Sequence, residues 1–158
     1  MLFPFLIQFF DLATMRPDDT DFTATTELEL KPNPPGATVD EKSGTCWCHG
    51  IVLWFETGFT SRFCKETPVV LSTSPYGPKT HWSQTIFTFQ EPIAMTWAKC
   101  ISGAAAAVGT KDSPVVRIRP RISIARSSHH RSIDISMETT GICSDGRKRS
   151  WPVQIFNL

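Results

Sequence analysis

The amino-acid sequence predicts an all-β protein whose antiparallel strands form a barrel or a sandwich. The 158 residues suffice for one domain or part of one, and we treat residues 1–158 as a single domain. Twelve Pro, nine Gly and recurrent clusters of Thr, Ile, Val and Phe favour strands and turns over helices. No long stretch of the sequence carries apolar residues at helical spacing, which supports the same fold class.

The first ten residues are apolar and predict an interior strand. They are too few to cross a bilayer, which takes about 20 apolar residues in a helix. No basic residue precedes Arg16, so the segment does not read as a signal peptide. A polar turn follows over residues 15–22, where Pro17 and three Asp supply turn chemistry.

Two strands and a loop are predicted next. A half-buried strand is expected over residues 26–31, because two Leu alternate with Glu27 and Glu29. Three Pro and a Gly then mark a loop, which we place over residues 31–49. Residues 50–56 are apolar on both faces, as in a strand inside a closed or stacked sheet.

The middle of the chain alternates short strands with turns. Residues 69–71 predict a strand that leads into a Pro/Gly turn at residues 74–78. A further strand is expected over residues 85–89, and residues 93–95 continue the sheet. Four consecutive Ala between two Gly are too few to nucleate a helix, so residues 99–114 are predicted to be a loop or insertion.

The clearest hairpin is predicted over residues 116–138, where apolar and polar residues alternate on both sides of a polar loop at residues 127–130. The expected partners are Ile124 with Ile133, Ile122 with Ile135, Arg119 with Glu138, and Ser123 with Asp134. Pro120 lacks an amide donor, which predicts an edge position or a bulge. Residues 152–156 read as a closing strand.

Composition limits the classes of partner. The formal net charge of +1 gives no strong field for nucleic acid or a membrane surface, so we expect neither as a direct partner. Five irregularly spaced Cys favour a reducing compartment over a disulfide framework. The Cys46-x-Cys48-His49 motif lacks a second ligand pair at finger-like spacing, so free thiols are expected and no metal site is predicted.

The most informative motif is Thr80-His81-Trp82. It follows a Ser-Thr-Ser-Pro turn at residues 72–75 and precedes a Gln and a predicted strand. This arrangement resembles the active-site loop of the protein arginine N-methyltransferase family. The strand over residues 49–55 is also similar to that family, as are the Phe10-Asp11-Leu12 and Asp21-Phe22 segments. Within the family, the sequence resembles most narrowly the plant nuclear type I enzyme numbered six.

The resemblance implies a fold and a site. The chain would be the C-terminal substrate-binding barrel of a class I methyltransferase, in the nucleus, the cytoplasm or both. His81 would bond to an acidic group on the cofactor domain and so support catalysis. Trp82 would form one wall of the slot for the substrate arginine, and Thr80 would shape the turn. An indole face attracts a planar guanidinium by about 0.5–2 kcal/mol.

The same resemblance implies what this chain does not carry. In the family, the Rossmann-like domain that binds S-adenosylmethionine, the loop with two catalytic glutamates and the dimerisation arm lie upstream. Glu27 and Glu29 do not replace those glutamates, because they sit on a predicted strand without the surrounding pattern. We therefore expect no cofactor on this chain alone and no catalysis by it. The implied partners are arginine-containing proteins, such as histone tails and Gly-Arg-rich proteins, and a second subunit.

Other interpretations remain open at this stage. The chain could be a stand-alone module that binds arginine-rich proteins or an intact methyltransferase. An unrelated β-sandwich would require the match over residues 70–89 to be chance. His81 could be a surface residue and Trp82 a core residue. The basic run at residues 147–149 is expected to be a solvated loop rather than a nuclear import signal.

Overall fold

The computed structural model describes residues 4–30, 44–60, 62, 64–97 and 106–158. In this part of the chain β7 is antiparallel to β1, β2 and β8, β8 is antiparallel to β9, and β4 is antiparallel to β5. No α-helix occurs there, and no sheet closes on itself. The elements are a 3-10 helix η1 (Pro17–Thr20) and strands β1 (Phe22–Thr25), β2 (Leu28–Glu29), β3 (Thr45–Leu53), β4 (Glu56–Phe59), β5 (Val69–Ser72), β6 (Thr85–Thr96), β7 (Arg117–Arg126), β8 (Ile133–Ile142) and β9 (Lys148–Asn157). The predicted all-β, antiparallel class is confirmed.

The chain divides into two compact units. One comprises Met1–Cys48 with Ile93–Leu158, and the other comprises His49–Pro92. Strand β3 begins at Thr45, so the end of the loop predicted over residues 31–49 is strand, whereas residues 31–43 lie outside the described part. No helical segment among the described residues is long and apolar enough to cross a membrane.

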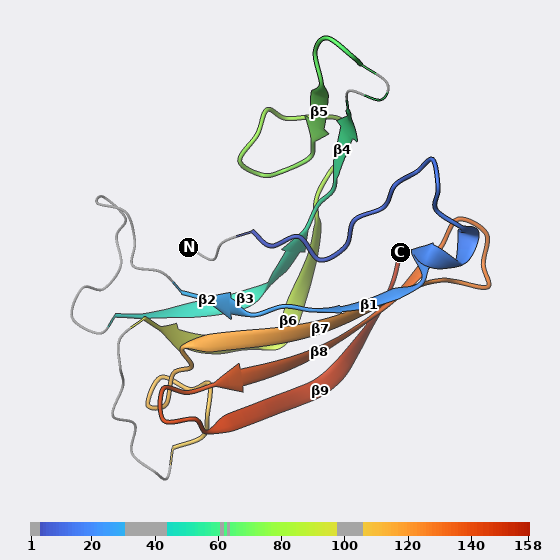
Figure 1. Cartoon of the computed structure of the whole chain (residues 1–158). Coiled ribbons are helices and arrows are strands. Elements are labelled where there is room, and N and C mark those ends of the chain that lie inside the picture. Colours follow the sequence, from blue (N-terminus) through green and yellow to red (C-terminus); the bar gives the residue numbers. More distant parts are fainter. Residues whose placement is uncertain (1–3, 31–43, 61, 63, 98–105) are drawn as a thin grey trace. The chain divides into compact units, whose positions relative to one another are not determined.

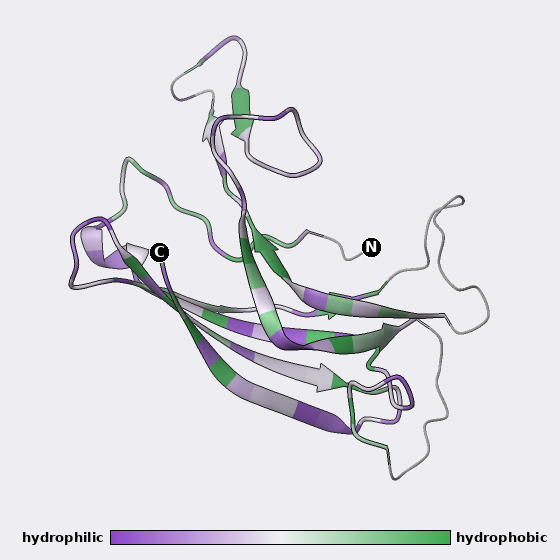
Figure 2. Cartoon of the chain, turned by 180° about the vertical axis from the view of Figure 1, so that it is seen from behind, coloured by the Kyte–Doolittle hydropathy of each residue, from purple (hydrophilic) through white to green (hydrophobic). Residues whose placement is uncertain are grey.

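The first unit is built on a five-stranded sheet with β7 near its centre. β1 and β2 pair with one side of β7, and β8 pairs with its other side and then with β9 (Figure 1). Hydrophobic and hydrophilic residues alternate along these strands, as Figure 2 shows. Ile118 and Met137 are fully buried and Arg121 is exposed, as predicted, whereas Ile133, which was predicted to face inward, is 41% exposed at the start of β8.

The predicted register of this hairpin is wrong by two residues. Ile124 pairs with Ile135 and Ile122 with Met137, rather than with Ile133 and Ile135. The shift also moves Glu138 from Arg119 to Arg121, and Asp134 from Ser123 to Ala125. The connection spans residues 127–132 instead of four residues, with positive φ at Arg131. A slip of two residues keeps every side chain on its face, which is why the faces were predicted correctly.

Pro120 lies in the central strand, not at an edge or a bulge. Its backbone faces the gap between β1 and β2, where Thr26 donates to the Pro120 carbonyl oxygen at 3.2 Å. Proline has no amide hydrogen, so Pro120 cannot donate a hydrogen bond back to Thr26. The hydrogen-bond ladder on this side of β7 is therefore interrupted at Pro120. Of the strand predicted over residues 26–31, β2 comprises Leu28–Glu29, and residue 31 lies outside the described part.

The prediction of an interior strand at the N-terminus is wrong for residues 4–10. These residues form no strand, and the side chains of Leu6 and Phe9 are 81% and 75% exposed. An apolar run becomes a strand only when another strand hydrogen-bonds to it. None of the described strands pairs with this segment.

Arginine side chains hold the described part of the second predicted loop. Arg147 donates to the Ala106 carbonyl oxygen at 3.0 Å and to the Ser113 hydroxyl at 3.1 Å. Arg149 donates to the Val108 carbonyl oxygen and lies 4.7 Å from the centre of the Trp151 ring. These two members of the basic run therefore bind the protein itself and are not simply solvated.

The polar face of the sheet carries an ion-pair network. Arg119 Nε donates to Glu27 at 2.8 Å, and Arg117 contacts both Glu27 and Glu29. The hydrogen bond from Arg119 is the main reason why the pKa of Glu27 lies below its ordinary value. The carboxylates of Glu27 and Glu29 are thus used in holding β2 to β7.

A Glu27→Gln variant should show what this network contributes. Because the pKa of Glu27 is lowered in the folded state, its carboxylate stabilises the fold at pH values above the ordinary pKa of 4.5. This stabilisation is lost as the pH falls through the lower pKa of the folded state. We expect the variant to unfold at lower urea concentration than wild type at pH 7, with the difference shrinking at acid pH. Exposed Glu66→Gln is the control. An equal difference at both pH values would contradict the assignment.

Candidate functional site

The Thr-His-Trp motif lies in the second unit, on the loop between β5 and β6 (Figure 1). Thr73 closes the base of this loop and is almost fully buried. Its amide donates to the Phe55 carbonyl oxygen at 3.0 Å, and its hydroxyl donates to the same oxygen at 2.9 Å. The Phe55 amide donates back to that hydroxyl at 3.1 Å, and Gln84 Nε2 donates to the Thr73 carbonyl oxygen at 2.6 Å. The loop therefore has a rigid base.

The predicted turn at residues 74–78 is confirmed as the first part of the loop. Gly77 donates its amide to the Ser74 carbonyl oxygen at 3.1 Å, which closes the turn around Pro75. The Ser74 hydroxyl also accepts from the Tyr76 amide at 3.2 Å. Serine and proline thus supply the local hydrogen bond and the fixed φ that such a turn needs.

The structure brings the three predicted site residues together. Thr80 donates its hydroxyl to the Trp82 carbonyl oxygen at 3.1 Å, a hydrogen bond within the loop. The His81 and Trp82 rings lie 3.7 Å apart between centres, with planes inclined by 35°. Trp82 is 43% exposed, so it is not a core residue. The site is a hydroxyl, an imidazole and an accessible indole on one short segment.

Sequence reasoning missed Phe55 as part of this site. The run over residues 50–56 was predicted to be one continuous strand, but β3 ends at Leu53 and β4 begins at Glu56. Phe55 lies in the break, and its ring centre is 5.9 Å from that of Trp82 with planes at 73°. The preceding Trp54 makes a similar inclined pair with Tyr76 at 6.3 Å. Two adjacent aromatic residues were the only sequence signal for these contacts.

The described residues contain no group of three or more His, Cys, Asp or Glu that could hold a metal ion. Cys46, Cys48, Cys64 and Cys143 form no disulfide bond. Burial raises the pKa of the Cys46 thiol, which favours the protonated form over a metal-binding thiolate.

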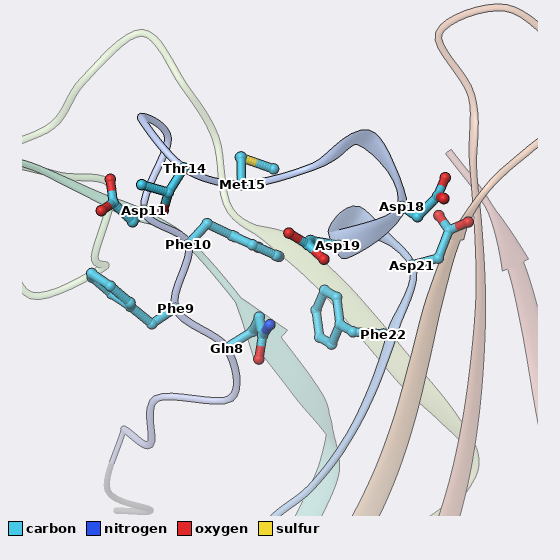
Figure 3. A pocket seen from close by; sticks show the side chains of 10 residues that line it. All are labelled: Gln8, Phe9, Phe10, Asp11, Thr14, Met15, Asp18, Asp19, Asp21 and Phe22. Atoms are coloured by element: carbon cyan, nitrogen blue, oxygen red, sulfur yellow. The ribbon is translucent and has the colours of Figure 1, made fainter.

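A separate hollow of about 390 Å³ lies in the first unit, between the N-terminal segment and η1 (Figure 3). Phe10 and Phe22 line it with ring centres 5.7 Å apart. Two of its four aspartates bind Arg126, whose guanidinium donates to Asp18 at 2.9 Å and whose amide donates to Asp21 at 2.9 Å. The backbone hydrogen bond from Arg126 is the main reason why the pKa of Asp21 is lowered. These contacts tie η1 to the end of β7.

An antiparallel β protein that presents an indole, an imidazole and a hydroxyl on one surface loop has an aromatic face that can attract a flat or cationic group. Residues 2–138 match the family described as the arginine methyltransferase oligomerization subdomain. The chain belongs to this family.

Curated relatives agree with that assignment. The chain is 63% identical over 149 residues to "Probable protein arginine N-methyltransferase 3" of Oryza sativa subsp. japonica, which covers 94% of this chain and 23% of the relative. It is 58% identical over 157 residues to the Arabidopsis thaliana protein of the same name, covering 98% of this chain and 25% of the relative. The chain thus spans about a quarter of the length of these relatives.

The narrower resemblance to the enzyme numbered six is not supported. "Protein arginine N-methyltransferase 6" of Xenopus laevis is 37% identical over 83 residues, covering 52% of this chain and 23% of the relative. The plant relatives numbered three match at higher identity over nearly the whole chain.

The residues of the loop do not fit S-adenosylmethionine, the cofactor that the resemblance implies. Dinucleotide-binding folds hold comparable adenosine groups with a Gly-rich turn before a helix and with an acidic side chain on the ribose. Thr80, His81 and Trp82 offer a hydroxyl, an imidazole and an indole instead. We assign no cofactor contact to this loop.

Proposed function

We propose that this chain supplies the arginine-binding wall of a protein arginine N-methyltransferase. Trp82 stacks against the guanidinium of a substrate arginine, and Thr80 holds the backbone that carries the indole. His81 supports the site by bonding to an acidic group of the cofactor domain. The substrates are arginine-containing proteins, such as histone tails and Gly-Arg-rich proteins, in the nucleus or the cytoplasm.

The observation that supports this proposal is the state of Trp82. Its indole is 43% exposed, so part of the ring is open to a ligand, while the His81 and Phe55 rings pack against it. A planar cation matches that face, because the ring quadrupole attracts positive charge. The loop offers no carboxylate to neutralise the guanidinium, so we propose that the chain alone binds arginine weakly and does not catalyse methyl transfer.

Calorimetric titration of the chain with a Gly-Arg-rich peptide tests the proposal. We expect weak binding that disappears when citrulline, which is planar but uncharged, replaces arginine. Trp82→Ala should abolish the binding, because cation–π contact contributes about 0.5–2 kcal/mol and the rest of the affinity is small. Titration with S-adenosylhomocysteine should give no heat of binding.

Trp47→Ala is the matched control, because Trp47 is similarly exposed at 49% but lies on β3 in the first unit. It should leave peptide binding unchanged. Equal binding of the arginine and citrulline peptides would reject the guanidinium site. Full binding by Trp82→Ala would reject the role of the indole.

A second candidate function is pairing with a methyltransferase chain, which the family description as an oligomerization subdomain favours. In this alternative the chain is a module that associates with an intact enzyme, in addition to or instead of binding arginine-rich proteins. Analytical ultracentrifugation with and without the full-length plant relative distinguishes pairing from arginine binding. Only pairing produces a heavier species, and a citrulline peptide should leave that species intact.

A further inference from the structure

We propose that Phe55 is the positioning residue of the arginine slot: it sets the orientation of the Trp82 indole and thereby the preference of the site for a flat cation. This inference rests on the proposed function of Trp82. It adds a residue that lies outside the Thr-His-Trp motif, on a different segment of the chain.

Among the described residues, the rings of His81 and Phe55 neighbour the indole. Of these two rings, that of Phe55 can hold the indole against the rest of the unit. His81 precedes Trp82 on the same exposed loop, so its ring moves with the indole. Phe55 lies 5.9 Å away on the segment between β3 and β4, with its ring plane at 73° to the indole plane. Such an inclined pair is a preferred geometry of aromatic rings. Phe55 therefore restricts rotation of the indole.

The backbone of Phe55 is itself held in place. Its amide and carbonyl make three hydrogen bonds with Thr73, between 2.9 and 3.1 Å. Thr73 is 1% exposed, so these bonds are partly buried at its side. Thr73 is also where the loop that carries Trp82 begins. The same buried residue therefore anchors the backbone of Phe55 and the start of the Trp82 loop.

Orientation decides selectivity in this arrangement. A guanidinium is planar and stacks on an indole face, whereas a lysine ammonium is compact and gains less from a fixed ring plane. An indole free to rotate would lose most of the advantage of the flat cation. Phe55 thus favours arginine over lysine without touching either.

Nuclear magnetic resonance of the indole N–H groups tests the inference on the 158-residue chain. The five Trp give five side-chain signals, and Trp82→Phe identifies the one from Trp82. Phe55→Leu should move that signal and weaken binding of a Gly-Arg-rich peptide about fivefold, within the range that one aromatic pair contributes. The ratio of affinities for Gly-Arg-rich and Gly-Lys-rich peptides should fall with it. Phe55→Tyr keeps the ring and should restore both.

Two further variants keep the result interpretable. Thr73→Val removes the hydroxyl that holds Phe55 while leaving both rings, and it should move the same Trp82 signal. Tyr76→Leu removes the other aromatic pair of the loop and should leave the Trp82 signal in place.

An unmoved Trp82 signal in Phe55→Leu and Thr73→Val would overturn the inference, as would an unchanged arginine-to-lysine ratio in a variant whose signal has moved. If wild type binds no Gly-Arg-rich peptide, the proposed function fails. The indole signal would then still show separately whether Phe55 orients Trp82.

Discussion

Replacing Ile122 by proline is expected to unfold the first unit. Ile122 is 3% exposed and pairs with Ala24 on β1 and Met137 on β8. Residues two apart in a strand direct their backbone groups to the same neighbour, and Pro120 bonds to the β1 side through Thr26. The Ile122 amide therefore serves the ladder with β1, and proline removes it.

The expected loss is a large share of the stability of the fold. A buried acceptor left without its donor costs about 1–3 kcal/mol, and the lost packing of a core isoleucine adds a further amount of about 1–3 kcal/mol. The total approaches the 5–15 kcal/mol that typically separates folded from unfolded chains, so we expect no cooperative urea transition.

Ile122→Val is the matched control, since it keeps the amide and should cost about 0.5–1.5 kcal/mol. Circular dichroism during urea unfolding measures both variants. If the proline variant unfolded at the same urea concentration as the valine variant, Ile122 would not belong to a central strand.

The second large effect is expected from Gly50→Ala, which places a methyl group where β3 meets β6. A Cβ at this position would lie 2.3 Å from the Phe87 carbonyl oxygen and 2.9 Å from Thr88 Cα. These are backbone atoms, so no side-chain rotation can relieve the contact and the two strands must separate. We expect a loss of about 3 kcal/mol, at the upper end of ordinary overpacking.

The same substitution should weaken the candidate site, because β6 begins immediately after the loop that carries Trp82. Urea unfolding and titration with a Gly-Arg-rich peptide together measure the two effects. Gly58→Ala on β4 is the control, because among the described residues the nearest atom to a Cβ there would be a Thr60 methyl at 3.9 Å. It should be neutral or slightly stabilising, because alanine loses less chain entropy than glycine. Equal behaviour of the two variants would contradict the close approach at Gly50.

Local patterning predicted most of the strands. Alternation of apolar and polar residues depends only on the direction of successive side chains, so it identified both faces of β7 and β8. It failed at residues 4–10, where an apolar run has no partner strand among those described. It also failed at residues 54–55, where the Thr73 hydroxyl bonds to the backbone of Phe55 and the strand breaks.

The candidate site was likewise predicted only in part from the sequence. The Thr80-His81-Trp82 motif, the turn before it and the resemblance to arginine methyltransferases were visible in the sequence, and the family is confirmed. The contact between Phe55 and Trp82 was not, because it joins residues 27 positions apart whose meeting depends on how β4 pairs with β5. No local pattern encodes such a meeting.

The sequence by itself therefore determined the all-β class, the inward and outward faces of the strands and the chemistry of the exposed loop. Each of these follows from the identity of a residue and its near neighbours. Only the tertiary structure decided the register of β7 on β8, the interruption at Pro120 and the aromatic contacts that orient Trp82. These depend on loop length and on contacts between distant segments, whose free energies differ too little between alternatives to be read from local patterns.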